Sequence, residues 1–328
     1  MDSGGSRGGG SSSGEGPTGM PSGGASGQGT QAGTLTAGAW DDNRNFSWFL
    51  QYRTKVAATG APGMLPIDEA EHRAANALHL NAQSGGAKTK LDIALALDTT
   101  GSMGDEIRYL QTEFDALSKR IQSTYPNAEQ RWSLVLYRDE GDAYVVGVDD
   151  FFANPQDFER KLKAASAGGG GDTPEAAAEA VDAATKLSWR TDTNVAKLLF
   201  WVADAPHHNN KAQVLANAAR SARDKNVHVY PVASSGIDEL TELTMRSTAQ
   251  LSGGRYLFLT NDSGVGGDHK EPSTPCYFVT KLDKAILRMV DIEMTGVYRE
   301  PDAADILRKG GDPKSGVCKI GDIDATIY

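Results

Sequence analysis

The chain has 328 residues and a formal net charge of -10 at pH 7, because 43 aspartate and glutamate residues outnumber 33 lysine and arginine residues. Proteins that bind nucleic acids or anionic membranes carry clustered lysine and arginine, and the sequence has no such cluster, so neither partner is expected. The sequence also lacks an apolar run of about eighteen residues, so no membrane span is expected.

Residues 1–87 divide into two segments of different composition. Residues 1–33 are rich in glycine and serine with almost no apolar content, which predicts a disordered tether, either a functional linker or a leader without a role. Residues 34–87 begin with a group of aromatic side chains, among which Trp48, Phe49 and Tyr52 have helical spacing. We expect a short amphipathic helix that docks on the main domain, or alternatively a partner-binding segment. A polar connection is expected to follow, over residues 62–88.

Residues 88–299 alternate between apolar runs and helical periods, which predicts one α/β domain with a C-terminal extension over residues 300–328. Two runs, 91–97 and 196–203, are almost entirely apolar, as expected for strands buried on both faces of a sheet. Further strands are expected at 131–137, 144–152, 227–233 and 255–259, the first two as a hairpin, and helices at 156–165, 174–187, 211–225, 238–251 and 281–298. The predicted fold is a doubly wound, mostly parallel central sheet flanked by helices.

Polar residues directly follow both apolar strands. Asp98, Thr100 and Ser102 occupy alternate positions after the first strand, with Gly101 available for a backbone turn, and Asp204 follows the second strand. Open α/β sheets bind their ligands at the carboxyl ends of such strands. Because these side chains offer carboxylate and hydroxyl oxygens, the expected ligand is a hard cation.

Three short segments resemble the loops of a von Willebrand factor type A (vWA) domain, namely DTTGSM at 98–103, GGGGDTPEA at 168–176 and VADAPHH at 202–208. The closer match is the bacterial and hemicentin-like branch of the family, and the resemblance covers residues 88–299. It implies a Rossmann-like fold and a metal-ion-dependent adhesion site (MIDAS). In that site Asp98, Thr100 and Ser102 match the DxSxS signature, and Asp204 matches the aspartate of the third loop.

The resemblance also implies that an open position on the metal accepts an acidic side chain from a protein partner. Oxygen ligands suit Mg²⁺, with Ca²⁺ or Mn²⁺ as alternatives. The middle loop departs from the family, because Gly171 stands where many members have a metal-binding threonine. Asp172 is expected either to reach the metal or, like Thr173, to cap a helix that begins at Pro174, where Glu175 suits the helix dipole.

Two further polar groups are expected to have structural roles. His207 and His208 are expected to be solvated or to cap a helix rather than to bind metal, and Asp139 and Glu140 are expected to form a polar hairpin turn.

The leading functional hypothesis is a metal-dependent protein-binding module for adhesion or interaction, without catalytic activity. A regulatory or scaffold subunit of a larger complex is the alternative. A phosphatase-like hydrolase is less favoured, because Asp98 is followed two residues later by Thr100 rather than by a second acid. An exported or cell-surface location is favoured over the cytoplasm, although no signal peptide follows Met1. Cys276 and Cys318 are expected either to form a disulfide or to remain free thiols.

Overall fold

The computed structural model describes Met1 and residues 32–82, 87–171, 173–321 and 323–327. Most of the expected tether over residues 1–33 therefore lies outside the described residues, and so does Asp172.

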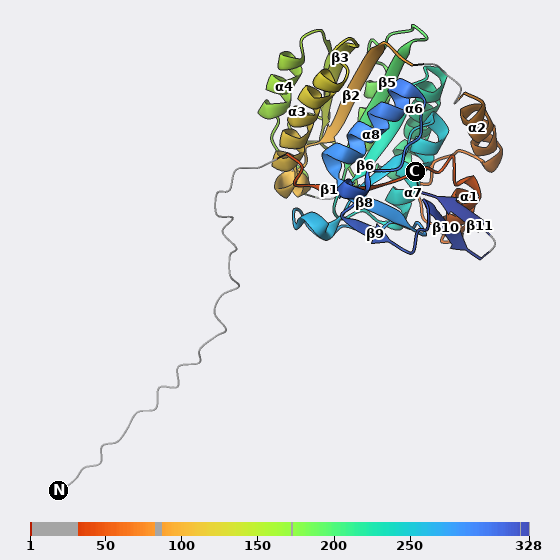
Figure 1. Cartoon of the computed structure of the whole chain (residues 1–328). Coiled ribbons are helices and arrows are strands. Elements are labelled where there is room, and N and C mark those ends of the chain that lie inside the picture. The colour runs from red at the N-terminus through yellow and green to blue at the C-terminus, as the bar shows by residue number, and fades with distance from the viewer. Residues whose placement is uncertain (2–31, 83–86, 172, 322, 328) are drawn as a thin grey trace.

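A central sheet organises the described part of the chain (Figure 1). Its strands are β1 (Thr36–Trp40), β2 (Lys90–Asp98), β3 (Glu129–Tyr137), β4 (Val146–Phe152), β5 (Val195–Ala203), β6 (His228–Ala233), β7 (Tyr256–Leu259), β8 (Tyr277–Lys281) and β9 (Arg308–Gly310). Among the described residues they form one nine-stranded sheet in the order β4-β3-β2-β5-β6-β7-β1-β8-β9. Strands β3, β2, β5, β6 and β7 are parallel, while β4, β1 and β9 pair antiparallel with their neighbours. The predicted α/β class with a mostly parallel central sheet is confirmed.

Helices cover both faces of this sheet (Figure 1). They are α1 (Phe46–Ala57), α2 (Glu69–Ala82), α3 (Ile107–Thr124), α4 (Pro155–Ala164), α5 (Ala177–Thr185), α6 (Ala212–Asp224), α7 (Glu239–Ser252) and α8 (Leu282–Thr295). Short 3-10 turns are η1 (Gly101–Asp105), η2 (Asn209–Lys211), η3 (Asn261–Ser263) and η4 (Ala303–Asp305). Helices α3, α4 and α8 pack on one face and α5, α6 and α7 on the other, with α1 and α2 outside α7.

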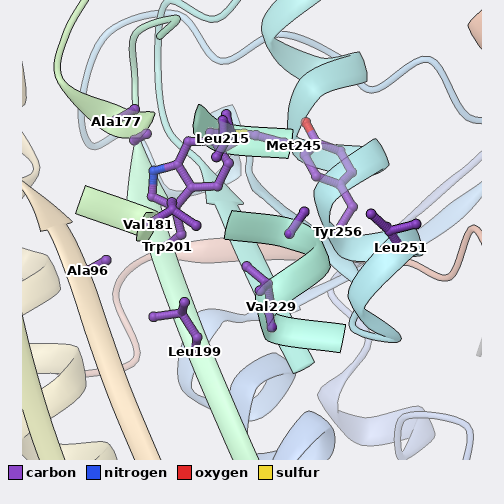
Figure 2. Close-up of a cluster of buried hydrophobic side chains, with 14 of the residues drawn as sticks. Ala96, Ala177, Val181, Leu199, Trp201, Leu215, Val229, Met245, Leu251 and Tyr256 are labelled. Carbon is purple, nitrogen blue, oxygen red and sulfur yellow. The ribbon is translucent and has the colours of Figure 1, made fainter. Parts of the chain in front are cut away.

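Strand β2 shows why the two faces differ. Its larger side chains, such as Leu95 and Leu97, point toward α3 and α8, while Ala94 and Ala96 point toward α5. Small residues on that side leave room for the large ring of Trp201 from β5. Figure 2 shows this second core, which β5, β6 and the helices α5, α6 and α7 build together.

Strand β1 corrects the prediction for the segment after residue 34. The expected helix is present as α1, and Phe49 and Tyr52 are buried as its spacing predicts. No strand was expected before it, yet β1 lies between β7 and β8 inside the sheet. Gly38 allows this, because a Cβ there would lie 2.2 Å from a ring carbon of Phe258. The expected boundaries at residues 34, 88 and 300 stay predictions, but β1 shares its sheet with strands of the predicted 88–299 domain.

Two other stretches also differ from expectation. Residues 69–82, predicted as part of a polar connection, form α2, whose buried side chains include His72 and Ala75. The C-terminal extension forms β9 and a separate hairpin of β10 (Val317–Ile320) and β11 (Ile323–Thr326). A disulfide between Cys276 and Cys318 joins this hairpin to the segment before β8, which resolves the open alternative in favour of a bond. Among the described helices, none combines the length and apolar character that a membrane crossing requires.

Candidate metal site

The loops that follow β2 and β5 meet at one edge of the sheet. Strand β2 ends at Asp98, and β5 ends one residue before Asp204. The two strands are adjacent and parallel, with Leu97 paired to Val202, so their carboxyl ends lie side by side as expected. Asp98 is fully buried and Asp204 is nearly so.

Asp98 organises the loop that follows it. Its Oδ1 accepts hydrogen bonds from the Thr100 amide at 2.9 Å and from the Thr100 hydroxyl at 2.7 Å. The Thr100 and Ser102 hydroxyl oxygens lie 3.1 Å apart, and the Ser102 side chain in turn hydrogen-bonds to Asp204. The structure thus brings together Asp98, Thr100, Ser102 and Asp204. Within the described ranges, the buried Asp98 Oδ2 and Asp204 Oδ1 have no hydrogen bond of normal geometry.

The glycine loop at residues 168–171 packs against the Asp98 loop. The Gly101 amide donates to the Gly169 carbonyl oxygen at 3.0 Å, and the Gly170 amide donates to the Asp142 carboxylate at 2.9 Å. Gly169 and Gly170 have φ values of 73° and 65°, in the left-handed region that glycine adopts without a steric penalty. The run of glycines therefore lets this loop approach the end of β2 closely.

The predictions for Asp172 and Thr173 have different outcomes. Asp172 lies outside the described residues, so its predicted contact with a metal stays a prediction. The capping role that it shared with Thr173 assumed a helix starting at Pro174, and that start is wrong because α5 begins at Ala177. Residues 173–176 instead extend toward the third loop, where an isolated parallel bridge joins Glu175 to His207.

Glu175 is a site residue that sequence reasoning missed, because it was expected only to suit a helix dipole. Its amide donates to the Pro206 carbonyl oxygen at 2.9 Å, which joins the middle and third loops. Its carboxylate is buried, and Oε2 has no hydrogen bond from a described residue. Oε1 lies 3.3 Å from where a Cβ on Gly170 would stand, and Thr100 Cβ lies 3.2 Å from the same point. The available signal was a glutamate inside a loop already matched to the family.

Burial and the charges of neighbouring carboxylates raise the pKa of these carboxyl groups. Burial, with the charge of Asp204, raises the pKa of Asp98 to about 7. Burial, with the charge of Glu106, raises the pKa of Asp204 to about 6 against a favourable hydrogen bond from Ser102. Burial, with the charge of Asp98 first among its neighbours, raises the pKa of Glu175 to about 8. A bound cation would offset both the repulsion and the desolvation.

The donor atoms suit a hard cation. Oxygens of carboxylates and hydroxyls are the ligands that Mg²⁺, Ca²⁺ and Mn²⁺ prefer. No set of three or more His, Cys, Asp or Glu side chains in the described part of the chain is arranged to hold a metal ion. A cation at this edge would therefore need hydroxyl and water ligands beside Asp98 and Asp204, which is the usual situation for Mg²⁺.

The two histidines of the third loop behave differently from each other. His207 is buried, and neither ring nitrogen has a hydrogen bond of normal geometry within the described ranges, so the prediction that it is solvated or caps a helix is wrong. Burial also lowers the pKa of His207. His208 is partly exposed, and its Nε2 lies 2.5 Å from Asp139 Oδ1. The Asp139 turn is thereby attached to the rim of the site, which its prediction as a polar turn did not include.

The sheet order, the helices on both faces and the loops at the carboxyl ends of β2 and β5 define an α/β protein of the open-sheet class. Within that class, the von Willebrand factor A domain family matches residues 92–265, more than half of the chain, and the chain belongs to this family.

The chain is also similar to two other proteins. The chain is 26% identical over 188 residues to a protein named putative ariadne-like RING finger protein R811 from Acanthamoeba polyphaga mimivirus. That match covers 52% of this chain and 18% of the relative, so the chain spans less than a fifth of that protein. The crystal structure of the conserved hypothetical protein BatB from Bacteroides thetaiotaomicron aligns with a TM-score of 0.42 at 15% identity, covering 62% of this chain and 98% of BatB.

Proposed function

We propose that this chain is a protein-interaction module that binds its partner through a divalent cation at a MIDAS-type site. A von Willebrand factor A domain suggests a protein-interaction role. The observation that carries the metal dependence is the pair of buried carboxylates of Asp98 and Asp204, whose Oδ2 and Oδ1 atoms have no hydrogen bond of normal geometry within the described residues. Buried carboxylates are normally paired with a cationic group or bound to a metal. The GGGGDTPEA loop supports membership of the bacterial and hemicentin-like branch.

The residues that would hold the ion are Asp98, Thr100, Ser102 and Asp204, and the proposed ion is Mg²⁺, with Ca²⁺ or Mn²⁺ as alternatives. When bound, the ion supplies an electrophilic position for an aspartate or glutamate side chain of the partner. The chain itself carries a net charge of -10, so a partner surface that is basic or neutral around that side chain would avoid repulsion.

The proposed role is binding and not catalysis. Thr100 stands where a phosphatase of the haloacid-dehalogenase type needs a second carboxylate, so the site lacks that acid. The disulfide between Cys276 and Cys318 supports an exported or cell-surface location, because disulfides persist in oxidising compartments.

A calorimetric titration of the full chain tests the metal site. We expect the parent protein to bind one Mg²⁺ or Ca²⁺ per chain, and Asp98→Ala to abolish binding because it removes the carboxylate that organises the loop. Asp312→Ala, at an exposed aspartate in the C-terminal region, is the matched control and should leave the affinity unchanged. Equal affinity of the parent and Asp98→Ala would overturn the site assignment.

The partner contact has its own test. A partner retained by the immobilised parent chain should be released by EDTA and should not be retained by Asp98→Ala. Changing one aspartate or glutamate of that partner to its amide should remove most of the binding, because few residues carry most of an interface's binding energy. A partner that survives both EDTA and Asp98→Ala would place recognition on another surface.

A further inference from the structure

A cavity of about 260 Å³ opens at the end of the sheet opposite the Asp98 site. Its lining includes residues 195–197 at the start of β5 and His228 at the start of β6. The remaining walls come from α2, from the C-terminal ends of α6, α7 and α8 with the residues just after them, and from Lys88 before β2. The proposed metal site lies at the other end of β5, so the two sites share none of these lining residues.

The cavity is lined by more cations than anions, in a chain that is acidic as a whole. Lys88, Lys197, Arg223 and Arg255 all contribute to its lining, against one acid, Glu293. Glu293 is already bound, since it accepts from His228 Nδ1 at 2.8 Å and lies 3.5 Å from Arg255. The His228 and Arg255 charges outweigh the effect of burial and lower the pKa of Glu293 to about 2, so this acid stays ionised inside its own cluster.

Arg223 pairs with Glu71 at 3.4 Å and with Asp224 at 3.2 Å, whereas the two lysines have no such partner among the described residues. Lys197 is only 8% exposed, and its Nζ donates to the backbone carbonyl oxygen of Lys225 at 2.5 Å. The Lys88 Nζ donates to the carbonyl oxygen of Thr193 at 2.9 Å. Within the described part of the chain, neither ammonium lies within ion-pair distance of a carboxylate.

The charges around Lys197 have both signs. Burial lowers the pKa of Lys197, the charge of Asp92 opposes this, and the charges of Lys225 and Lys88 add to the lowering. Asp92 is itself bound by two arginines, so it does not act as a dedicated counter-ion. A buried ammonium without a carboxylate partner is costly, and an anionic group in the cavity would relieve that cost.

Part of the cavity lining is apolar. Leu78 lines the cavity and is 63% exposed, although large apolar side chains are normally buried. Leu251 and Ile292 also line the cavity. The apolar part of the lining and the two lysines together favour a ligand with an anionic head and an apolar body.

We propose that this cavity binds a small amphipathic anion, with a carboxylate or phosphate head near Lys197 and Lys88 and an apolar body against Leu78 and the other apolar lining residues. The proposal is independent of the metal site. The cavity lies at the start of β5, whereas the von Willebrand factor A loops lie at the other end of the sheet.

Calorimetry of the full chain in EDTA with four probes tests the ligand class. Octanoate and octyl phosphate should bind, and the tighter of the two identifies the head group. Octylamine, which has the same body with a positive head, should not bind, and acetate, which has the head without the body, should bind at least tenfold more weakly than octanoate. The proposal is overturned if octylamine binds as tightly as octanoate, or if acetate does.

Variants test the position. Lys197→Met and Leu78→Ser should each weaken binding of the better probe, Lys197→Met by at least tenfold. Lys88→Met provides a second test if loss of the Lys197 contact with the end of α6 impairs folding, because Lys88 is partly exposed. Lys161→Met, on the exposed side of α4, should bind like the parent. Asp98→Ala should also bind like the parent, which keeps this site distinct from the metal site. Unchanged affinity in both Lys88→Met and folded Lys197→Met would refute the assignment.

Discussion

Glu175 shows how one buried carboxyl group can make the stability of this protein depend on pH. Its pKa is raised to about 8, first by burial and then by the charges of Asp98 and Asp139. Between its ordinary pKa of 4.5 and about 8, the folded chain keeps a proton that the unfolded chain loses. Stability from this group is therefore full below pH 4.5 and declines as the pH rises toward 8.

We predict that Glu175→Gln stabilises the metal-free protein at pH 8 and much less at pH 5. The amide cannot ionise, so the gain in the free energy of unfolding at pH 8 should be at least about 1 kcal/mol. Urea denaturation in EDTA at both pH values measures it. Glu300→Gln, at an exposed position, is the control. A gain of equal size at both pH values would show that ionisation of Glu175 is not the cause.

Metal affinity should change with pH in the opposite direction. The pKa values of Asp98 and Asp204 are raised to about 7 and about 6, and a metal ligand must lose its proton before it binds. We predict that the apparent affinity for Mg²⁺ or Ca²⁺ rises by about tenfold or more from pH 5.5 to pH 8. Calorimetric titration across this range checks it, and a flat profile would mean that these carboxyl groups do not bind the ion.

At the scale of single residues, the sequence identified site residues that directly follow strands. It did not identify site residues that are positioned by tertiary contacts. Asp98 and Asp204 were recognisable because each ends an apolar run, and Thr100 and Ser102 by their spacing from Asp98. Glu175 could not be placed in the same way. Its burial depends on the hydrogen bond between its amide and the third loop, which only the folded chain provides.

Gly101 and Gly104 differ in how closely other atoms pack against them. A Cβ on Gly101 would lie 2.8 Å from the Gly169 carbonyl oxygen, whereas a Cβ on Gly104 would have no atom within 4 Å. Both residues belong to η1. The difference between them is therefore the contact with the glycine loop.

We predict that Gly101→Ala weakens divalent-ion binding and that Gly104→Ala does not. Overpacking of this kind costs about 1–3 kcal/mol, and a displaced loop should lower the affinity by about tenfold or more. Calorimetric titration gives the affinity, and urea denaturation shows whether both variants fold. If the two alanine variants bind equally well, the packing of the glycine loop on η1 is not needed for the site.

At the scale of helices and strands, the sequence predicted the elements whose residues are mostly apolar. Strands β2 and β5 were clear because almost every residue in them is apolar and buried. Helix α2 was missed because part of its buried face is polar, with His72 Nδ1 lying 2.5 Å from Gln250 Oε1. Strand β1 is only five residues long, and its alanines and glycine carry little strand signal.

For the whole molecule, the position of β1 means that the first described strand completes the sheet of the family domain. It lies between β7 and β8, and the residues after it neutralise buried arginines. Asp42 binds the fully buried Arg246 through two hydrogen bonds of 2.9 and 2.6 Å, and Asp41 binds Arg255 at 2.9 Å. The sequence resemblance, which begins at residue 88, gave no sign of this dependence.

We therefore predict that a chain of residues 88–328 does not fold, while a chain of residues 34–328 does. Without β1, strands β7 and β8 lose their shared neighbour, and Arg246 and Arg255 lose the carboxylates of Asp42 and Asp41. Arg246 would keep Glu242 at 3.2 Å and Arg255 would keep Glu293 at 3.5 Å, so each arginine loses its closer carboxylate and not its only one. Losing a hydrogen bond to a charged group costs about 1–3 kcal/mol, and the total stability of a domain is only about 5–15 kcal/mol. Asp42→Asn in the full chain is the milder version, and it should lower the free energy of unfolding by about 1–3 kcal/mol. Circular dichroism and urea denaturation measure all three, and a cooperative transition for residues 88–328 at the urea midpoint of residues 34–328 would show that β1 is dispensable.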